Sequence, residues 1–316
     1  MTRTRLAMVV LLIFIISLTP LTPLSLTQAV TTVSTQEEVT SEPLLRSFTD
    51  LVTVYATVRD SSGHIVSGLG PQDFELFDNQ IKQKIEYFSE KDHPSSIGIL
   101  LDTSISMKNK LDIAKLAVRQ FIDRRQQGDQ FFIITFNTNV ELTYDFTYSL
   151  DGIVGSLFGL QADGLTALND AVYLGIRKLQ QGHYRRRALL LISDGENNSS
   201  KIKEDVLCYT LSEANVQLYA IGILDKGGLG KRGQQLLNKL SEISGGLTFF
   251  TPIIELNNAI DAINTDLRHQ YSLGFIPTDD PAGSWHKLKL RVKGEPNINY
   301  LIRNRSGYRA VANKSY

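Results

Sequence analysis

The sequence predicts an α/β fold in which a doubly wound, mostly parallel sheet is inserted between N- and C-terminal segments that form a small β-sandwich-like domain. Three observations support this prediction. Four nearly continuous apolar runs are typical of strands covered on both faces, and the stretches between them carry apolar residues at helical spacing. The flanking segments show the period-two alternation of half-buried strands.

The N-terminus has the composition of an export signal. Arg3 and Arg5 precede an apolar run from Leu6 to Leu18, and small residues follow around Ala29. This pattern predicts a signal peptide over residues 1–29 and a linker over 30–47. Because two prolines break the run early, cleavage is favoured over a retained membrane anchor. We therefore expect the rest of the chain to be secreted or to lie in the periplasm or cell envelope, with membrane contact only through an uncleaved N-terminal segment.

The charge balance argues against a nucleic-acid partner. Thirty-three basic residues match thirty-three acidic ones, so no net field draws the chain to polyanions. The single cysteine excludes an internal disulfide. An exported chain without one depends on its apolar core and on any metal that it binds.

Residues 48–92 are predicted to form an N-terminal β segment, because apolar residues alternate with polar ones from Val52 to Val58 and again around Phe74 and Ile85. The turns fall at polar and glycine-rich stretches. A C-terminal β segment at 269–312 shows the same alternation. Neither segment has enough strands for a sandwich, so we expect the two to pack together.

The region 95–268 between them is predicted to be the α/β domain. Its apolar runs lie at 97–101, 131–134, 188–192 and 218–223. Helical spacing appears at 114–122, 168–179 and 256–267. Strands that alternate with helices form parallel sheets with right-handed crossovers.

Oxygen-bearing side chains gather where these predicted strands end, which is where open α/β sheets bind their ligands. Five of them are candidate metal ligands: Asp102, Ser104, Ser106, Thr166 and Asp194. No histidine or cysteine is among them, which favours Mg²⁺, Mn²⁺ or Ca²⁺ over zinc or copper. Helix capping and strand termination could explain each loop by itself, but three such loops at matched strand ends favour a site.

The order and spacing of Asp102-x-Ser104-x-Ser106, Thr166 and Asp194 resemble the metal-ion-dependent adhesion site of von Willebrand factor A domains. The flanks, with Val-Arg-Asp-Ser-Ser-Gly and Gln-Tyr-Ser-Leu-Gly-Phe, resemble a bacterial group called VWFA-related proteins. The resemblance implies a Rossmann-like domain in which the three hydroxyls bind the ion. Asp102 and Asp194 then act directly or through water.

The resemblance also implies a function. Neutral hydroxyls leave the ion electrophilic, so an acidic side chain of a protein ligand can complete its coordination, with Mg²⁺ the first expectation. Specificity would then reside in the loops at 137–141, 161–163 and 196–200. One departure is Ile105, where many relatives have glycine, and its side chain could shield the ion. We expect a binding protein and not an enzyme.

Three alternatives remain open. A magnesium-dependent phosphotransferase would use Asp102 as nucleophile, but such enzymes need a second carboxylate two residues on, where Ser104 stands. A serine hydrolase lacks the Gly-x-Ser-x-Gly elbow, and the five histidines lie in unrelated segments. In the third alternative, the chain is an envelope scaffold whose metal is purely structural.

Overall fold

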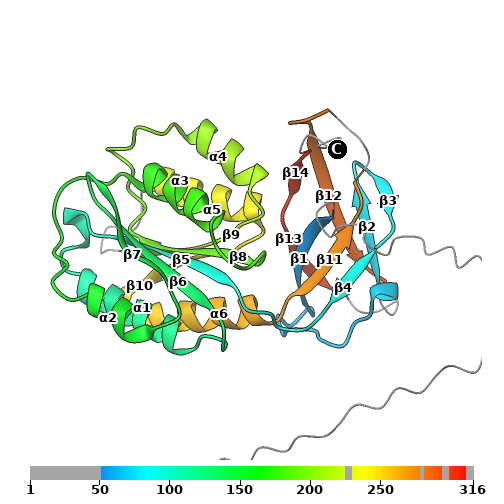
Figure 1. Ribbon diagram of the computed structural model, residues 1–316, viewed down its shortest axis with the longest axis horizontal. Helices are drawn as coiled ribbons and strands as arrows, with labels where there is room; N and C mark the ends of the chain where they lie inside the picture. The colour runs from blue at the N-terminus through cyan, green and yellow to red at the C-terminus, as the bar shows by residue number, and fades with distance from the viewer. Residues whose placement is uncertain (1–50, 225–229, 278–280, 294–298, 311–316) are drawn as a thin grey trace, which may run out of the picture. The chain divides into compact units, whose positions relative to one another are not determined.

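A six-stranded sheet forms the centre of the α/β part of the computed structural model (Figure 1). Its strands in spatial order are β10 (Thr248–Pro252), β9 (Gln217–Leu224), β8 (Arg187–Ser193), β5 (Ser96–Asp102), β6 (Gln130–Phe136) and β7 (Val140–Thr147). All neighbours are parallel except β6 and β7, which pair antiparallel. The predicted fold class, a mostly parallel doubly wound sheet, is confirmed.

The structure describes residues 51–224, 230–277, 281–293 and 299–310. The predicted signal peptide at 1–29 and the linker at 30–47 lie outside these residues. Within the described part of the chain, no helix is both long and apolar enough to cross a membrane.

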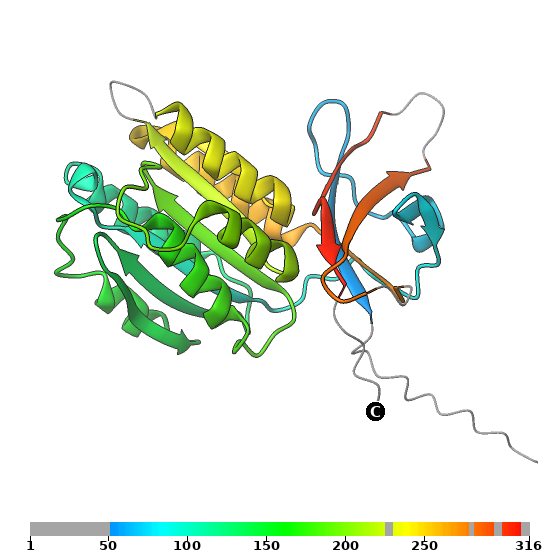
Figure 2. The ribbon, with the colours of Figure 1, turned by 90° about the horizontal axis from the view of Figure 1, so that it is seen from above.

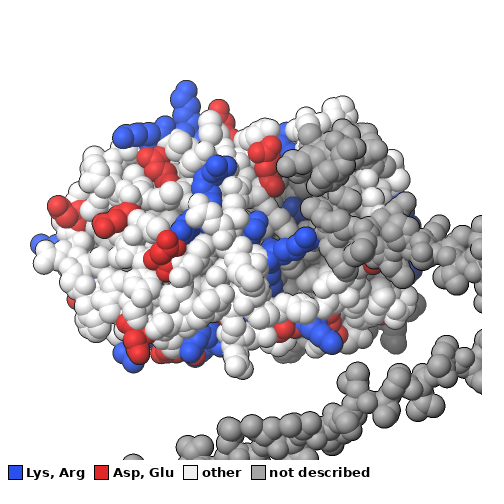
Figure 3. Space-filling model, in the orientation of Figure 1, with Lys and Arg blue, Asp and Glu red and all other residues white. Residues whose placement is uncertain are grey.

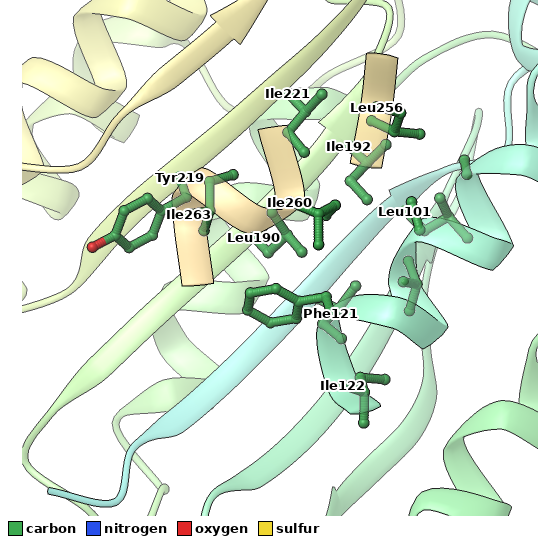
Figure 4. Close-up of a cluster of buried hydrophobic side chains, with 14 of the residues drawn as sticks. Leu101, Phe121, Ile122, Leu190, Ile192, Tyr219, Ile221, Leu256, Ile260 and Ile263 are labelled. Carbon is green, nitrogen blue, oxygen red and sulfur yellow. The ribbon is translucent and has the colours of Figure 1, made fainter. Parts of the chain in front are cut away.

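Helices cover both faces of the sheet (Figures 1 and 2). One face carries α1 (Leu111–Asp123), α2 (Leu150–Ser156) and α6 (Leu256–Arg268), and the other carries α3 (Leu168–Leu179), α4 (Glu204–Glu213) and α5 (Lys231–Ser244). In Figure 4, Phe121 of α1 and Ile260 of α6 lie around Leu190 of the sheet. Burial on both faces explains why these strands are apolar at nearly every position.

Two strands of this sheet have no counterpart among the predicted elements. The strand β7 begins at Val140, inside the stretch 137–141 that the sequence predicted as loop. Its residues are half-buried or exposed, as befits an edge strand. The other edge strand, β10, is only five residues long. Edge strands carry a weak apolar signal because one side of each faces no neighbour.

The flanking segments build two four-stranded sheets. The first has the order β13 (Leu301–Asn304), β1 (Val52–Arg59), β11 (Tyr271–Phe275) and β4 (Tyr87–Ser89). The second has the order β14 (Gly307–Arg309), β12 (Trp285–Val292), β2 (Phe74–Asp78) and β3 (Ile81–Gln83). Three short 3₁₀ turns complete the described elements: η2 (Pro71–Asp73), η3 (Ile105–Met107) and η4 (Ile253–Glu255).

Strands from the two ends of the chain pair with each other. Val54 of β1 lies opposite Leu273 of β11, and Leu76 of β2 lies opposite Leu290 of β12. Their inward side chains share one apolar cluster. Each flanking segment therefore supplies half of a core that neither could close alone.

Charged side chains of both signs are interspersed on the face shown in Figure 3. This distribution agrees with the balanced composition. A mixed surface gives the chain no extended field of one sign over that face.

Candidate functional site

The candidate site lies at the carboxyl ends of the central strands. After β5 the chain crosses to β6 through α1, whereas after β7 it returns across the sheet to β8 through α3. The winding therefore reverses beside β5, and β5 and β8 are hydrogen-bonded neighbours. Loops that leave two adjacent strands in opposite directions open a crevice at such a point.

The loop after β5 is organised by Asp102, whose side chain is fully buried. Its Oδ1 accepts a hydrogen bond from the backbone N–H of Ser104 at 2.8 Å. Its Oδ2 accepts one from the Ser193 hydroxyl at 2.5 Å. The hydroxyls of Ser104 and Ser106 lie 3.0 Å apart. This loop thus places one carboxylate and two hydroxyls together.

The loop before α3 is joined to the first loop through the backbone. The N–H of Asp163 donates to Thr103 O at 2.9 Å, and that of Ile105 donates to Gly164 O at 3.1 Å. Thr166 follows directly and is almost fully buried. Its own N–H donates to the Asn198 side chain at 2.8 Å. Thr166 is therefore held between the loop after β5 and the loop after β8.

Asp194 directly follows β8, and its two carboxylate oxygens have different surroundings. Oδ2 lies 3.3 Å from the Lys110 ammonium, and both side chains are at least nine-tenths buried. Oδ1 is buried with no hydrogen-bond partner in the described structure. An unpaired buried carboxylate oxygen is costly unless something binds it.

Burial dominates the electrostatics of the site. It raises the pKa of Asp102 from 3.8 to about 6, against the opposing hydrogen bonds from Ser104 and Ser193, and the nearby Asp194 charge adds to the rise. Two carboxylates thus lie near each other in a site that is largely shielded from solvent. A hard cation would relieve both the repulsion and the orphaned oxygen.

The donor set suits Mg²⁺ in chemistry. Every candidate is a carboxylate or a hydroxyl, which are the ligands that hard divalent cations prefer. Among the described residues no group of three or more His, Cys, Asp or Glu could hold a metal. Any cation here would therefore depend on Ser and Thr oxygens besides the two aspartates. The structure brings Asp102, Ser104 and Ser106 into one loop and ties Thr166 and Asp194 to it through neighbouring loops.

The surroundings of the site combine apolar and charged groups. Ile105 and Leu165 are each about half exposed, at 52% and 51%, and they belong to the two loops that the backbone joins. A hollow of about 740 Å³ borders Asp194, with Lys201, Lys203 and Arg232 among its lining residues. The predicted specificity loop at 196–200 lies on this hollow.

Sequence reasoning missed Lys110. A lysine at a helix start gives no signal by itself, and only the turn η3 directs it back to Asp194.

A second cluster that the sequence did not predict lies in the β part. His286 Nδ1 is 2.9 Å from Asp78 Oδ2, and its Nε2 is 3.3 Å from the Ser284 hydroxyl. The Tyr308 hydroxyl also donates to Asp78, at 2.7 Å. These buried contacts link β2, β12 and β14. His286 is thus a satisfied core histidine of the β part.

The sequence is similar to known proteins. Residues 97–196 match the family model described as von Willebrand factor type A domain. A curated uncharacterized protein of Borreliella burgdorferi is 24% identical in an alignment of 139 residues that covers 41% of this chain. The chain spans only 40% of that relative's length.

Two solved structures show the same kind of similarity. Proximal thread matrix protein 1 from the mussel byssus has a TM-score of 0.50 at 18% identity, over 61% of this chain and 51% of that one. A von Willebrand factor type A structure from Catenulispora acidiphila has a TM-score of 0.49 at 14% identity, over 77% of this chain and 74% of that one.

Residues 97–196 match a type of domain that supports protein–protein interaction in general. Residues 97–196 form a von Willebrand factor type A domain, and the similarity to the mussel protein bears on the fold alone.

Proposed function

We propose that this chain is an exported binding protein that holds a divalent cation, Mg²⁺ first, at Asp102, Ser104, Ser106, Thr166 and Asp194. A cation held there would leave a position that an acidic side chain of a protein partner could take. The proposal is carried by one observation: Asp194 Oδ1 is buried without a partner in the described structure, near enough to the fully buried Asp102 for its charge to raise the pKa of Asp102.

The donor types support the second step of the proposal. Three of the five candidates are neutral hydroxyls, so the protein would contribute at most two negative charges to a doubly charged ion. The bound ion would remain electrophilic and would favour an external carboxylate as a further ligand. Ile105 and Leu165 would contact the apolar neighbours of that acidic residue, because both are exposed beside the site.

Export is part of the proposal on sequence grounds. The charged start, the apolar run and the small residues near Ala29 favour translocation. A partner would then be met in the envelope or outside the cell.

Metal binding is tested by calorimetric titration of the full-length chain with Mg²⁺ and Mn²⁺. Thr166→Ala should weaken cation binding at least tenfold, because it removes one of the three proposed hydroxyl ligands. Thr265→Ala on α6 is the matched control, since its exposed hydroxyl bonds only Asp261 O within its own helix. Equal cation affinity in the Thr166 and Thr265 variants would contradict the proposed site.

Partner capture is tested separately, with Mn²⁺ as a paramagnetic probe. Water proton relaxation of the Mn²⁺-loaded protein should fall when a glutamate-containing peptide displaces the bound water, and a glutamine peptide should have no effect. In parallel, pull-downs from envelope fractions are compared in Mg²⁺ and in chelator. Capture that is the same in both, together with a higher melting temperature in Mg²⁺, would instead favour the scaffold with a structural metal.

A further inference from the structure

Lys110 occupies an unusual position for a lysine. It is the N-cap residue of α1, and its N–H donates to Met107 O at 2.8 Å within the turn that follows Ser106. The side chain is about nine-tenths buried and ends 3.3 Å from Asp194 Oδ2. The segment after β5 therefore supplies candidate metal ligands and also a positively charged side chain, that of Lys110.

Two effects oppose an ammonium at this place. Burial removes its hydration, and the N-terminal end of a helix carries the positive end of the helix dipole. Capping residues at this position normally accept hydrogen bonds, which lysine cannot do. The nearby carboxylate of Asp194 offsets these costs, so the position makes physical sense as a charge partner of the site.

The contact is also a loose one. At 3.3 Å the separation of Lys110 Nζ and Asp194 Oδ2 lies beyond the usual range for a charged hydrogen bond. The other oxygen of Asp194 has no partner in the described structure. An ammonium that satisfies only one side of a buried carboxylate can be displaced by an ion of higher charge.

We propose that Lys110 is a built-in counter-ion that competes with the divalent cation for Asp194 and so sets the cation affinity of the site. This inference rests on the proposed metal site. Binding of the cation would separate the Lys110 ammonium from Asp194. The free energy that this separation costs makes the net binding of the metal weaker. Lys110 thereby makes the site selective for ions of high charge density. Only such ions attract Asp194 strongly enough to offset the cost of separating it from Lys110.

The test replaces Lys110 by methionine, which keeps an unbranched stem of similar length and removes the charge. Lys108→Met is the matched control, because Lys108 belongs to the same turn but is exposed. Calorimetry of the full-length chains with Mn²⁺ and Mg²⁺ gives the dissociation constants, and thermal melts in chelator give the stability of the metal-free protein.

Lys110→Met should bind Mn²⁺ at least tenfold more tightly than the wild type. It should also melt at a lower temperature in chelator, because two buried carboxylates then lack a counter-charge, and metal should raise its melting temperature by more than that of the wild type. Lys108→Met should match the wild type in both measurements. If Lys110→Met does not fold in chelator, Lys110→Arg, which retains the charge, should keep the wild-type affinity, and Lys110→Gln should bind more tightly.

Unchanged or weaker cation binding in Lys110→Met and Lys110→Gln would overturn the counter-ion role and leave the metal site standing. Absence of cation binding in every variant and in the wild type would overturn the metal site itself. The two failures are therefore distinguishable.

Discussion

The hydroxyl of Ser193 donates to Asp102 Oδ2 at 2.5 Å, and both side chains are fully buried at the ends of neighbouring strands. The same hydroxyl accepts a hydrogen bond from the N–H of Gly195 at 2.9 Å. Ser193 thus fixes the orientation of the Asp102 carboxylate and the start of the loop that carries Asp194. It was not among the predicted site residues.

Ser193→Ala should lower the free energy of unfolding by about 1–3 kcal/mol, because it leaves a buried carboxylate oxygen and a buried N–H without their partner. Denaturant unfolding in chelator measures the change. Ser61→Ala, at an exposed turn, is the control and should stay within about 0.5 kcal/mol of the wild type. If Ser193→Ala has the same free energy of unfolding as Ser61→Ala, the Ser193 hydrogen bonds do not stabilise the fold.

Asp102 predicts a pH dependence of stability. Burial raises its pKa in the folded chain from 3.8 to about 6. The proton is therefore bound more tightly in the folded state, so the fold is favoured below pH 3.8 and loses stability as the pH rises through 6. By pH 7.5 the loss from this group is on the order of 3 kcal/mol.

Asp102→Asn should remove this loss, since the amide does not ionise. In chelator, the stability of the wild type should fall between pH 4 and pH 7.5 relative to that of the variant, as measured by denaturant unfolding at both pH values. Parallel pH profiles for the two proteins would contradict the raised pKa. In chelator at pH 7.5, Asp102→Asn should therefore be more stable than the wild type. With Mg²⁺ at the same pH the wild type should be the more stable of the two if the proposed site is correct, because only the wild type is stabilised by binding the ion.

Gly98 in the middle of β5 predicts a packing limit. A Cβ atom at this position would lie 2.2 Å from Phe132 Cζ and 2.7 Å from Leu189 Cδ2. Gly98→Ala should therefore destabilise the fold by about 1–3 kcal/mol through overpacking. Gly155→Ala in α2 is the control, because a Cβ there meets nothing within 4 Å.

The control should be neutral or stabilising by up to about 1 kcal/mol, since alanine is the better helix former. Thermal melts of both variants give the comparison. A Gly98 variant that melts no lower than the Gly155 variant would mean that the sheet can move to make room.

The hydrogen bond between Tyr308 and Asp78 joins the two flanking segments, and we expect it to contribute to the stability of the fold. The hydroxyl of Tyr308 donates to Asp78 at 2.7 Å, and its ring stacks on His286 with centroids 4.7 Å apart. Tyr308→Phe keeps the ring and removes only the hydroxyl, so the free energy of unfolding should fall by about 1–3 kcal/mol. Tyr173→Phe is the control, a half-buried ring whose hydroxyl has no partner among the described contacts. Equal stability of the two variants in denaturant would contradict a role for this hydrogen bond.

The central strands of the α/β part could be predicted because a strand covered on both faces must be apolar at nearly every position. This requirement is visible in Leu100 and Leu191 without any knowledge of their neighbours. The edge strands β7 and β10 could not be predicted in this way, because each is covered along one side only. Polar residues interrupt both strands, with Glu141 and Thr143 in β7 and with Thr248 and Thr251 in β10.

The candidate ligands could be named from the sequence because their residue types and their places after buried strands are local properties. Lys110 and Ser193 could not be named, because a lysine at a helix start and a serine at a strand end are common and usually solvated or structural. Their roles arise from contacts with residues 84 and 91 positions away. Local pattern carries no information on such distances.

The sequence by itself determined the class of the fold, the alternation of strands and helices and the oxygen chemistry at the strand ends, because these follow from periodicity and residue type. The tertiary structure alone decided which polar groups meet: the ammonium of Lys110 and Asp194, the Ser193 hydroxyl and Asp102, and His286 with Asp78 and Ser284. Electrostatic and hydrogen-bond energies depend on separations of a few ångströms in a dry interior, and only the folded chain sets those separations.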